Sequence, residues 1–127
     1  MKKLIVLATL VAAVFTVPAS AGAASKDNRN GGFYEKITYT NVGGANPIAI
    51  SDWRSEITFV NSGCGSHKFK VNGGTQFSTA TICPTGGTVS VAGAHPSSNY
   101  AAGNTYTNHW SATSGWSPGT GNATVVV

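Results

Sequence analysis

The sequence predicts an all-β fold, a small antiparallel β-sandwich or partly open barrel of about seven or eight short strands. Three observations lead to this prediction. Short segments rich in β-branched and aromatic residues alternate between apolar and polar positions. Turn signals built from glycine, asparagine, serine and proline separate these segments at intervals of roughly 8–12 residues. No window after residue 21 shows the period of an amphipathic helix.

Composition and charge limit the classes of protein to consider. The chain has 127 residues, of which 41% are hydrophobic, and this content supports one folded domain rather than a disordered chain. Only 9% of residues are charged. After residue 21, six cations stand against four acids, a net charge of +2. These cations form no run or stripe, so we expect no nucleic-acid partner.

The first 21 residues have the three-part layout of a secretory signal peptide. Two lysines follow Met1, residues 4–17 are uncharged and mostly apolar, and small residues follow Pro18. Cleavage fits after Ala21 and almost as well after Ala23. The alternatives are a membrane anchor or a buried helix, but a helix over 4–17 would be about 21 Å long, too short for a membrane core of about 30 Å. We therefore expect a secreted protein, extracellular or periplasmic.

Residues 22–32 precede the first predicted strand. They are almost entirely polar, with several glycines, and we expect a flexible leader here. A single β-domain then occupies residues 33–127. Its first predicted strand, 33–42, carries phenylalanine, isoleucine and tyrosine on one face, although Glu35 interrupts that face near its start. A glycine-rich turn over 43–47 ends this strand.

The middle and end of the domain supply further predicted strands. Residues 48–50 are a short apolar segment, and residues 53–61 alternate clearly. Trp53 shares one face of that second segment with other apolar side chains, so we expect it to lie in the core. The remaining predicted strands, separated by loops rich in glycine, serine and proline, are 88–92, 104–113 and 123–127.

Asn72-Gly73-Gly74 is the strongest local signal in the chain. Asparagine and glycine accept the positive φ that hairpin turns require. We expect a three-residue loop that joins a strand over 67–71 to a strand within 75–83. In this register Val71 lies opposite Thr75, and Phe69 lies opposite Phe77, a favourable aromatic pair.

Cys64 and Cys83 are the two cysteines of the chain. In an oxidising compartment an even pair most simply forms one disulfide. The hairpin register places Cys64 opposite Ile82, and a single bulge, for instance at Gly65, would place it opposite Cys83 instead. We therefore expect a disulfide that closes the open end of the hairpin.

No spacing of acids or histidines indicates catalysis. Glycosidases generally need two neighbouring carboxylates, and we expect Glu35, Asp52 and Glu56 to be solvated surface acids. The three histidines are separated in the sequence and form no metal-binding pattern, and no nucleophile motif occurs. We expect no enzyme activity, no metal site and no cofactor.

Aromatic residues in the second half are the best candidates for binding. Trp116 lies in a segment of glycine, serine and proline, where side chains are usually exposed, and an exposed tryptophan often marks a contact site. The alternatives are that Trp116 covers one end of the core and that Trp110 lies within it. Aromatics beside amides and hydroxyls suit a carbohydrate or a protein surface. The predicted binding residues are Tyr100, Tyr106, His109, Trp110 and Trp116.

Several residues of the central region resemble the small secreted microbial α-amylase inhibitors: Trp53-Arg54, Cys64, Cys83-Pro84 and Gly86-Gly87-Thr88-Val89. Members of that family are disulfide-bonded β-sandwiches that present a Trp-Arg-Tyr turn. Here Ser55 stands in place of the tyrosine, and two cysteines stand in place of four. The resemblance implies a β-sandwich that displays Trp53-Arg54 on a turn.

Three functions follow from these observations. The first is a secreted, non-catalytic protein that binds a carbohydrate or protein surface through exposed aromatics. The second is a secreted antimicrobial or membrane-acting toxin, suggested by the low charge content, the positive net charge and the small polar residues of 75–81. The third is an inhibitor of an extracellular hydrolase. Only the second implies contact with a membrane.

Overall fold

A computed structural model describes residues 22–115 and 121–127. These residues form eight β-strands and no helix, which confirms the predicted all-β class. In chain order the strands are β1 (Ala24–Asn30), β2 (Phe33–Asn41), β3 (Ile48–Thr58), β4 (Gly63–Val71), β5 (Gly74–Ser78), β6 (Val89–Ala94), β7 (Thr105–Gly115) and β8 (Gly121–Val126).

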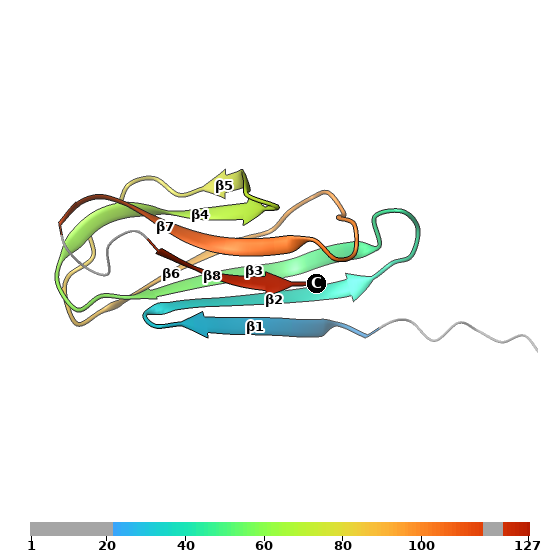
Figure 1. The fold of residues 1–127 in the computed structure, drawn as a ribbon, viewed down its shortest axis with the longest axis horizontal. Coiled ribbons are helices and arrows are strands. Elements are labelled where there is room, and N and C mark those ends of the chain that lie inside the picture. Colours follow the sequence, from blue (N-terminus) through green and yellow to red (C-terminus); the bar gives the residue numbers. More distant parts are fainter. Residues whose placement is uncertain (1–21, 116–120) are drawn as a thin grey trace, which may run out of the picture.

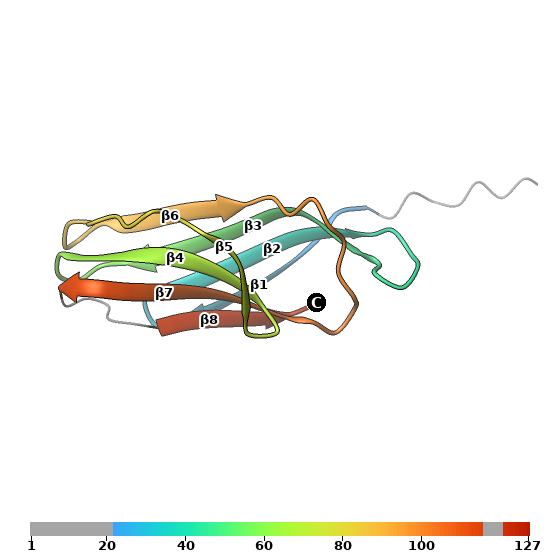
Figure 2. The ribbon, with the colours of Figure 1, turned by 90° about the horizontal axis from the view of Figure 1, so that it is seen from above.

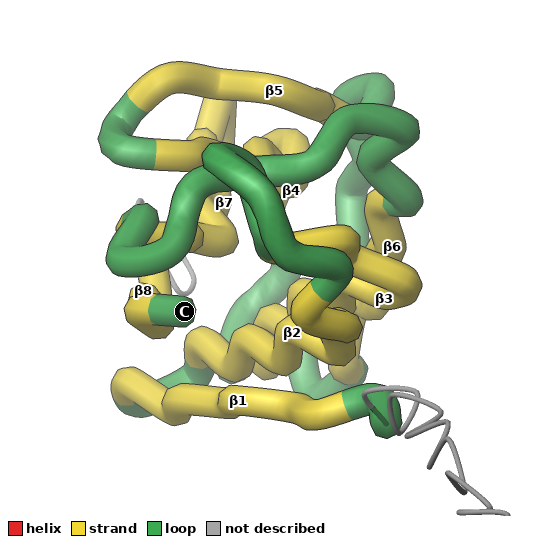
Figure 3. The backbone as a smooth tube through the Cα atoms, turned by 90° about the vertical axis from the view of Figure 1, so that its right-hand side faces the viewer, coloured by secondary structure: helices red, strands yellow, loops and turns green. Residues whose placement is uncertain are grey.

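The strands form two antiparallel sheets of four strands each (Figure 1). Sheet A has the order β1-β2-β3-β6, and sheet B has the order β5-β4-β7-β8. The inner faces of the two sheets pack against each other in a sandwich-like arrangement, seen from one end in Figure 3. The edge strands β1 and β8 are in contact at one side of the molecule, and β6 and β5 are the edge strands at the other (Figure 2).

Side chains of both sheets build the core. Trp53 of β3 is completely buried, as predicted, and its ring meets the edges of Phe69 and Tyr106 from sheet B, with centroids 5.2 and 5.5 Å away. A second cluster lies farther along the strands, where Phe59 meets Trp110 with centroids 5.1 Å apart. T-shaped contacts of a tryptophan therefore join the two layers at two separate points.

The segment expected to be a flexible leader contains strand β1. Its seven residues are all exposed, yet each pairs with a residue of β2. Side chains of β1 also reach the neighbouring edge of sheet B, where Lys26, Asn28 and Asn30 donate hydrogen bonds of 2.9–3.0 Å to backbone carbonyls of β8. Hydrogen bonds rather than apolar burial hold this strand, which is why its polar sequence does not indicate it.

The predicted hairpin is formed by β4 and β5, with a small correction to its turn. Asn72 and Gly73 have φ of 49° and 83°, so the turn has two residues, and Val71 lies opposite Gly74 rather than Thr75. A bulge after Phe69 then restores the predicted pairing of Phe69 with Phe77. The Asn-Gly pair tolerates the left-handed backbone that this tight turn requires.

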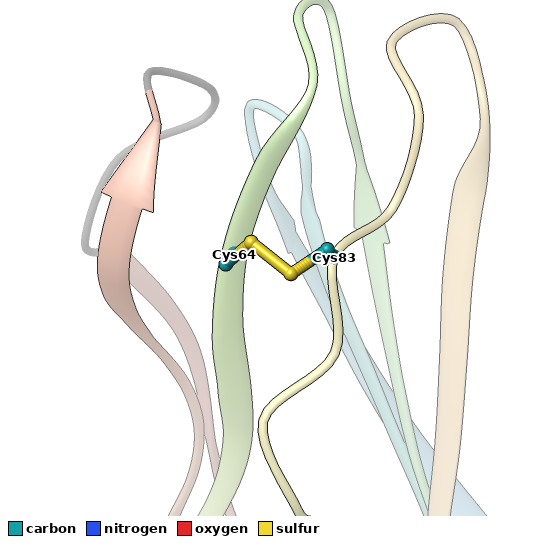
Figure 4. Close-up of a disulfide and its surroundings, with 2 residues drawn as sticks. All are labelled: Cys64 and Cys83. Atoms are coloured by element: carbon teal, nitrogen blue, oxygen red, sulfur yellow. A yellow bond between two sulfur atoms is a disulfide. The ribbon is translucent and has the colours of Figure 1, made fainter.

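The predicted disulfide between Cys64 and Cys83 is confirmed (Figure 4). Gly65 bridges Ile82, and this register brings Cys64 level with Cys83, with Cα atoms 4.0 Å apart. Glycine is required at position 65, because a Cβ there would lie 2.5 Å from the Ser111 carbonyl oxygen and 2.6 Å from the Trp110 ring. The disulfide thus ties the start of β4 to the segment that crosses from sheet B to sheet A.

Candidate functional site

Two of the predicted binding aromatics belong to the core, which corrects their assignment to a surface. Tyr106 is 0% exposed and Trp110 is 1% exposed. Both lie in β7 on the same face as Asn108, as the alternation predicts, but that face points between the sheets. Burial of a large aromatic side chain stabilises the folded state, so Tyr106 and Trp110 turn this face of β7 toward the core.

The other predicted binding residues do not form one aromatic platform. Tyr100 is half-buried, and its ring meets the edge of Tyr106 at 5.8 Å. His109 is also half-buried, but it lies on the opposite, outer face of β7. Trp116 lies outside the described residues. Among the five residues, His109 is therefore the one that the structure places on an open strand face.

A network of polar side chains crosses the core instead. His67 of β4 is buried, with Nδ1 2.9 Å from Ser55 Oγ and Nε2 2.8 Å from Ser90 Oγ, both in sheet A. Asn108 of β7 donates from Nδ2 to Ser55 Oγ at 3.1 Å and to the Tyr34 carbonyl at 2.7 Å. Every member of the network thus joins one sheet to the other.

This network has the residue types of a hydrolase but a different proton arrangement. Ser55 Oγ already accepts a hydrogen bond from Asn108, so its own proton is directed at His67 Nδ1. His67 Nε2 therefore carries the ring proton and donates it to Ser90 Oγ, whereas a general base would present a lone pair there. Burial also lowers the pKa of His67 to about 4 and keeps the ring neutral. The arrangement therefore does not activate Ser90, and Ser55, the serine that faces the lone pair of His67, is only 1% exposed between the sheets.

Glu35 is a second buried polar residue and was expected on the surface. Its side chain is 0% exposed, and Oε1 accepts a hydrogen bond of 2.6 Å from the Trp53 indole nitrogen. Its Oε2 has no hydrogen-bond partner among the described residues. Burial raises the pKa of Glu35 to about 8, so this carboxyl group is mostly protonated at neutral pH. Its place in the apolar alternation of Phe33 and Ile37 was the signal for burial.

The outer face of sheet B collects positive charge and hydroxyl groups. Lys68 lies opposite His109 in the strand register, and Lys70 lies opposite Thr107. Burial, and to a smaller extent the charges of Lys70 and Lys68, lowers the pKa of His109. We call this surface the cationic face; its residues are Lys68, Lys70, Thr107, His109, Asn122 and Thr124.

No carboxylate opposes the cationic face. All four acids of the chain lie in β1, β2 and β3, which are strands of sheet A. The outer face of sheet A carries cations beside acids: Arg54 pairs with Glu56 at 2.7 Å, and Lys36 lies opposite Asp27 in the strand register. Arg29 of the same face lies 4.9 Å from the centre of the Tyr34 ring. The two outer faces therefore differ in charge, mixed on sheet A and purely cationic on sheet B.

The Trp53-Arg54 pair does not lie on a turn. It falls inside the eleven-residue strand β3, with Trp53 buried and Arg54 exposed on the outer face. The display of this dipeptide implied by the resemblance to α-amylase inhibitors is therefore corrected. No protein-family model, curated protein or solved structure matches this chain.

Proposed function

We propose that this chain is a secreted, non-catalytic β-sandwich protein that binds an acidic carbohydrate through the cationic face. The observation that carries the proposal is the segregation of charge: Lys68 and Lys70 lie on a sheet without a single acidic residue. In the described residues no other strand face gathers cations without acids. Such a surface attracts polyanions and steers their approach.

The chemistry of the face suits a sugar polymer that carries acidic groups. Lys68 and Lys70 are two residues apart on one strand, so their Cα atoms are separated by about 7 Å along it. Thr107 lies opposite Lys70, and Thr124 lies on the far side of Thr107, with the two hydroxyl oxygens 3.0 Å apart. Ammonium groups would pair with carboxylate or sulfate groups, and the hydroxyl and amide groups would bond the sugar hydroxyls.

Export is part of the same proposal. The layout of residues 1–21 supports a signal peptide, and the Cys64–Cys83 disulfide is consistent with an oxidising environment. A binding protein of this kind would meet its carbohydrate outside the cytoplasm.

The test compares acidic and neutral glycans on one array. Residues 22–127 should bind polyuronates or sulfated glycans and should not bind their neutral counterparts. Lys68→Gln combined with Lys70→Gln should weaken binding about tenfold, since two partly exposed ion pairs contribute about 1.4 kcal/mol together. The matched control, Lys36→Gln with Arg54→Gln, removes the same charge from the outer face of sheet A and should bind like the parent.

Two outcomes on the glycan array would overturn the proposal, and a third result would replace it. Equal binding of neutral and acidic glycans would show that charge does not select the partner, and equal losses in the two double variants would show that the cationic face is not the site. Leakage of anionic lipid vesicles, without glycan binding, would replace the proposal with the membrane-acting alternative. None of the described residues belongs to a helix long and apolar enough to span a bilayer.

A further inference from the structure

The four edge strands of the two sheets differ in how they are protected from pairing with another chain. An open edge presents unpaired backbone groups, and charges, short length or bonds from side chains protect it. β1 carries Lys26, Asp27 and Arg29, and β8 has three of its carbonyls bonded by side chains of β1. β5 has five residues and carries a bulge at Gln76. Three edges are therefore protected.

β6 lacks these protections. Its sequence, Val-Ser-Val-Ala-Gly-Ala, contains no charge and no proline. Val89 and Val91 are 53% and 51% exposed on the outer face of sheet A. Phe77 and Ile82, each 38% exposed, lie along the β5 side of sheet B, which is the side of the molecule that β6 also borders. The β6 side therefore combines an open edge with exposed apolar side chains.

The backbone groups that β6 leaves free can be identified from its neighbours. Thr58 donates its N–H toward β2, to the Gly32 carbonyl, whereas Phe59 donates to Thr88 in the segment that leads into β6. Along an antiparallel strand, the backbone N–H and C=O groups of successive residues point to opposite neighbours. The groups of Ser90, Ala92 and Ala94 therefore point toward β3. The N–H and C=O groups of the intervening Val89, Val91 and Gly93 point away from the sheet. No bond from outside sheet A reaches them in the described part of the chain.

We propose that β6 pairs with β6 of a second copy of this chain, antiparallel about a two-fold axis at Val91. Val91 would lie opposite its own symmetry mate, and Val89 would lie opposite Gly93 of the second copy. Each of these pairs can exchange two backbone hydrogen bonds, because the free groups of all three residues face the partner. The four strands of sheet A would then continue into the four strands of a second sheet A.

The edge is complementary to itself in size and charge, which favours a second copy over another partner. The exposed side chain of Val89 would lie opposite Gly93 of the second copy, which leaves room for it. The two-fold axis repeats this pair on its other side. Next to β6, Arg54 and Glu56 already pair with each other, so they bring no unpaired charge to the junction. The uncharged strand offers nothing that would select a charged peptide.

Sedimentation velocity of residues 22–127 over a series of concentrations tests the pairing. The parent chain should form a dimer, and Val91→Lys should raise its dissociation constant at least about tenfold, a change of about 1.4 kcal/mol. Val126→Lys is the matched control: Val126 is 53% exposed and also lies on an edge strand, but on the opposite side of the molecule, and this variant should dimerise like the parent.

A second variant separates loss of pairing from loss of folding. A Cβ at the exposed Gly93 would have the Trp53 carbonyl oxygen as its nearest neighbour, at 3.8 Å, so the Cβ of Gly93→Ile meets no clash in the folded monomer. In the dimer the new side chain would crowd Val89 of the second copy, and dimerisation should weaken while the melting temperature of the monomer is kept. A parent chain that stays monomeric at every concentration, or equal behaviour of the two lysine variants, would overturn the inference. Neither result depends on glycan binding.

Discussion

Glu35→Gln should remove the loss of stability that we expect between pH 6.5 and 8. Burial raises the pKa of Glu35 from 4.5 to about 8 in the folded protein. Between these pH values the folded state therefore binds more protons than the unfolded state. Linkage then requires the free energy of unfolding to fall as pH rises, by at most about 1.4 kcal/mol per pH unit.

His67 acts in the opposite direction at lower pH. Burial lowers the pKa of His67 from 6.5 to about 4, so the unfolded state binds more protons in this window and stability rises with pH. Between pH 4.5 and 6.5 the slopes from Glu35 and His67 nearly cancel, and the parent protein should have a flat maximum there. Above this range only the Glu35 slope remains, and about 2 kcal/mol is lost by pH 8.

Urea unfolding of residues 22–127, with the disulfide intact, measures these slopes across the pH range. Glu35→Gln should be flat above pH 6.5 and should reveal the His67 slope below it, with stability falling as pH falls. The buried amide of glutamine has donors without an acceptor, so its absolute stability should be about 1–3 kcal/mol lower, and the slope is the quantity to compare.

Asp52→Asn is the control for loss of a carboxylate. Asp52 lies on the outer face of sheet A, opposite Thr38, and its removal should leave the parent curve in place. A parent stability that stays constant from pH 6.5 to 8, or a Glu35→Gln slope equal to that of the parent, would refute the reasoning.

Three further predictions follow from single contacts. Gly65→Ala should lower stability by about 3 kcal/mol or more in urea unfolding, because its Cβ would enter the Trp110 ring, whereas Gly93→Ala should change it by less than about 1 kcal/mol. Asn28→Ala should speed hydrogen exchange in β1 and β8 about threefold or more, since it removes the bond to the Thr124 carbonyl; unchanged exchange would contradict this role. If the proposed acidic glycan binds, affinity should rise as pH falls through the lowered pKa of His109, and His109→Gln should abolish that rise.

Local signals predicted the parts of the fold that depend on near neighbours. The Asn72-Gly73 pair specifies its turn through backbone preference, and the alternation after Trp53 identifies a buried strand face. The Cys64–Cys83 pairing followed from the hairpin register plus one bulge. These features depend on residues within one hairpin or one strand, so a single sequence contains the information for them.

The candidate site depends on contacts that alternation cannot supply. The alternation of side chains along β7 places Trp110 and His109 on opposite faces of the strand. It does not indicate which of these residues points toward the other sheet. The strand β1 forms because Asn28 reaches a carbonyl 96 positions away in the chain, and no local pattern marks such a partner. Glu35 lies among apolar neighbours, but its charge suggested a surface position, and only the packed core shows that it is buried and protonated.

The buried carboxyl and the cationic face are connected through the distribution of charge. With Glu35 neutral, three ionised acids remain after residue 21, and they share the outer face of sheet A with three cations, Arg29, Lys36 and Arg54. The unbalanced charge therefore falls on the other three cations: Lys26 at the β1–β8 edge, and Lys68 and Lys70 on sheet B. Protonation of one core residue thus raises the net charge after residue 21 from +2 to +3, and two of the three excess charges lie on the outer face of sheet B. Because the chain has few charged residues, the direction of its electrostatic field depends on where those residues lie rather than on how many there are. Their positions make the outer face of sheet B the surface to test for polyanion binding.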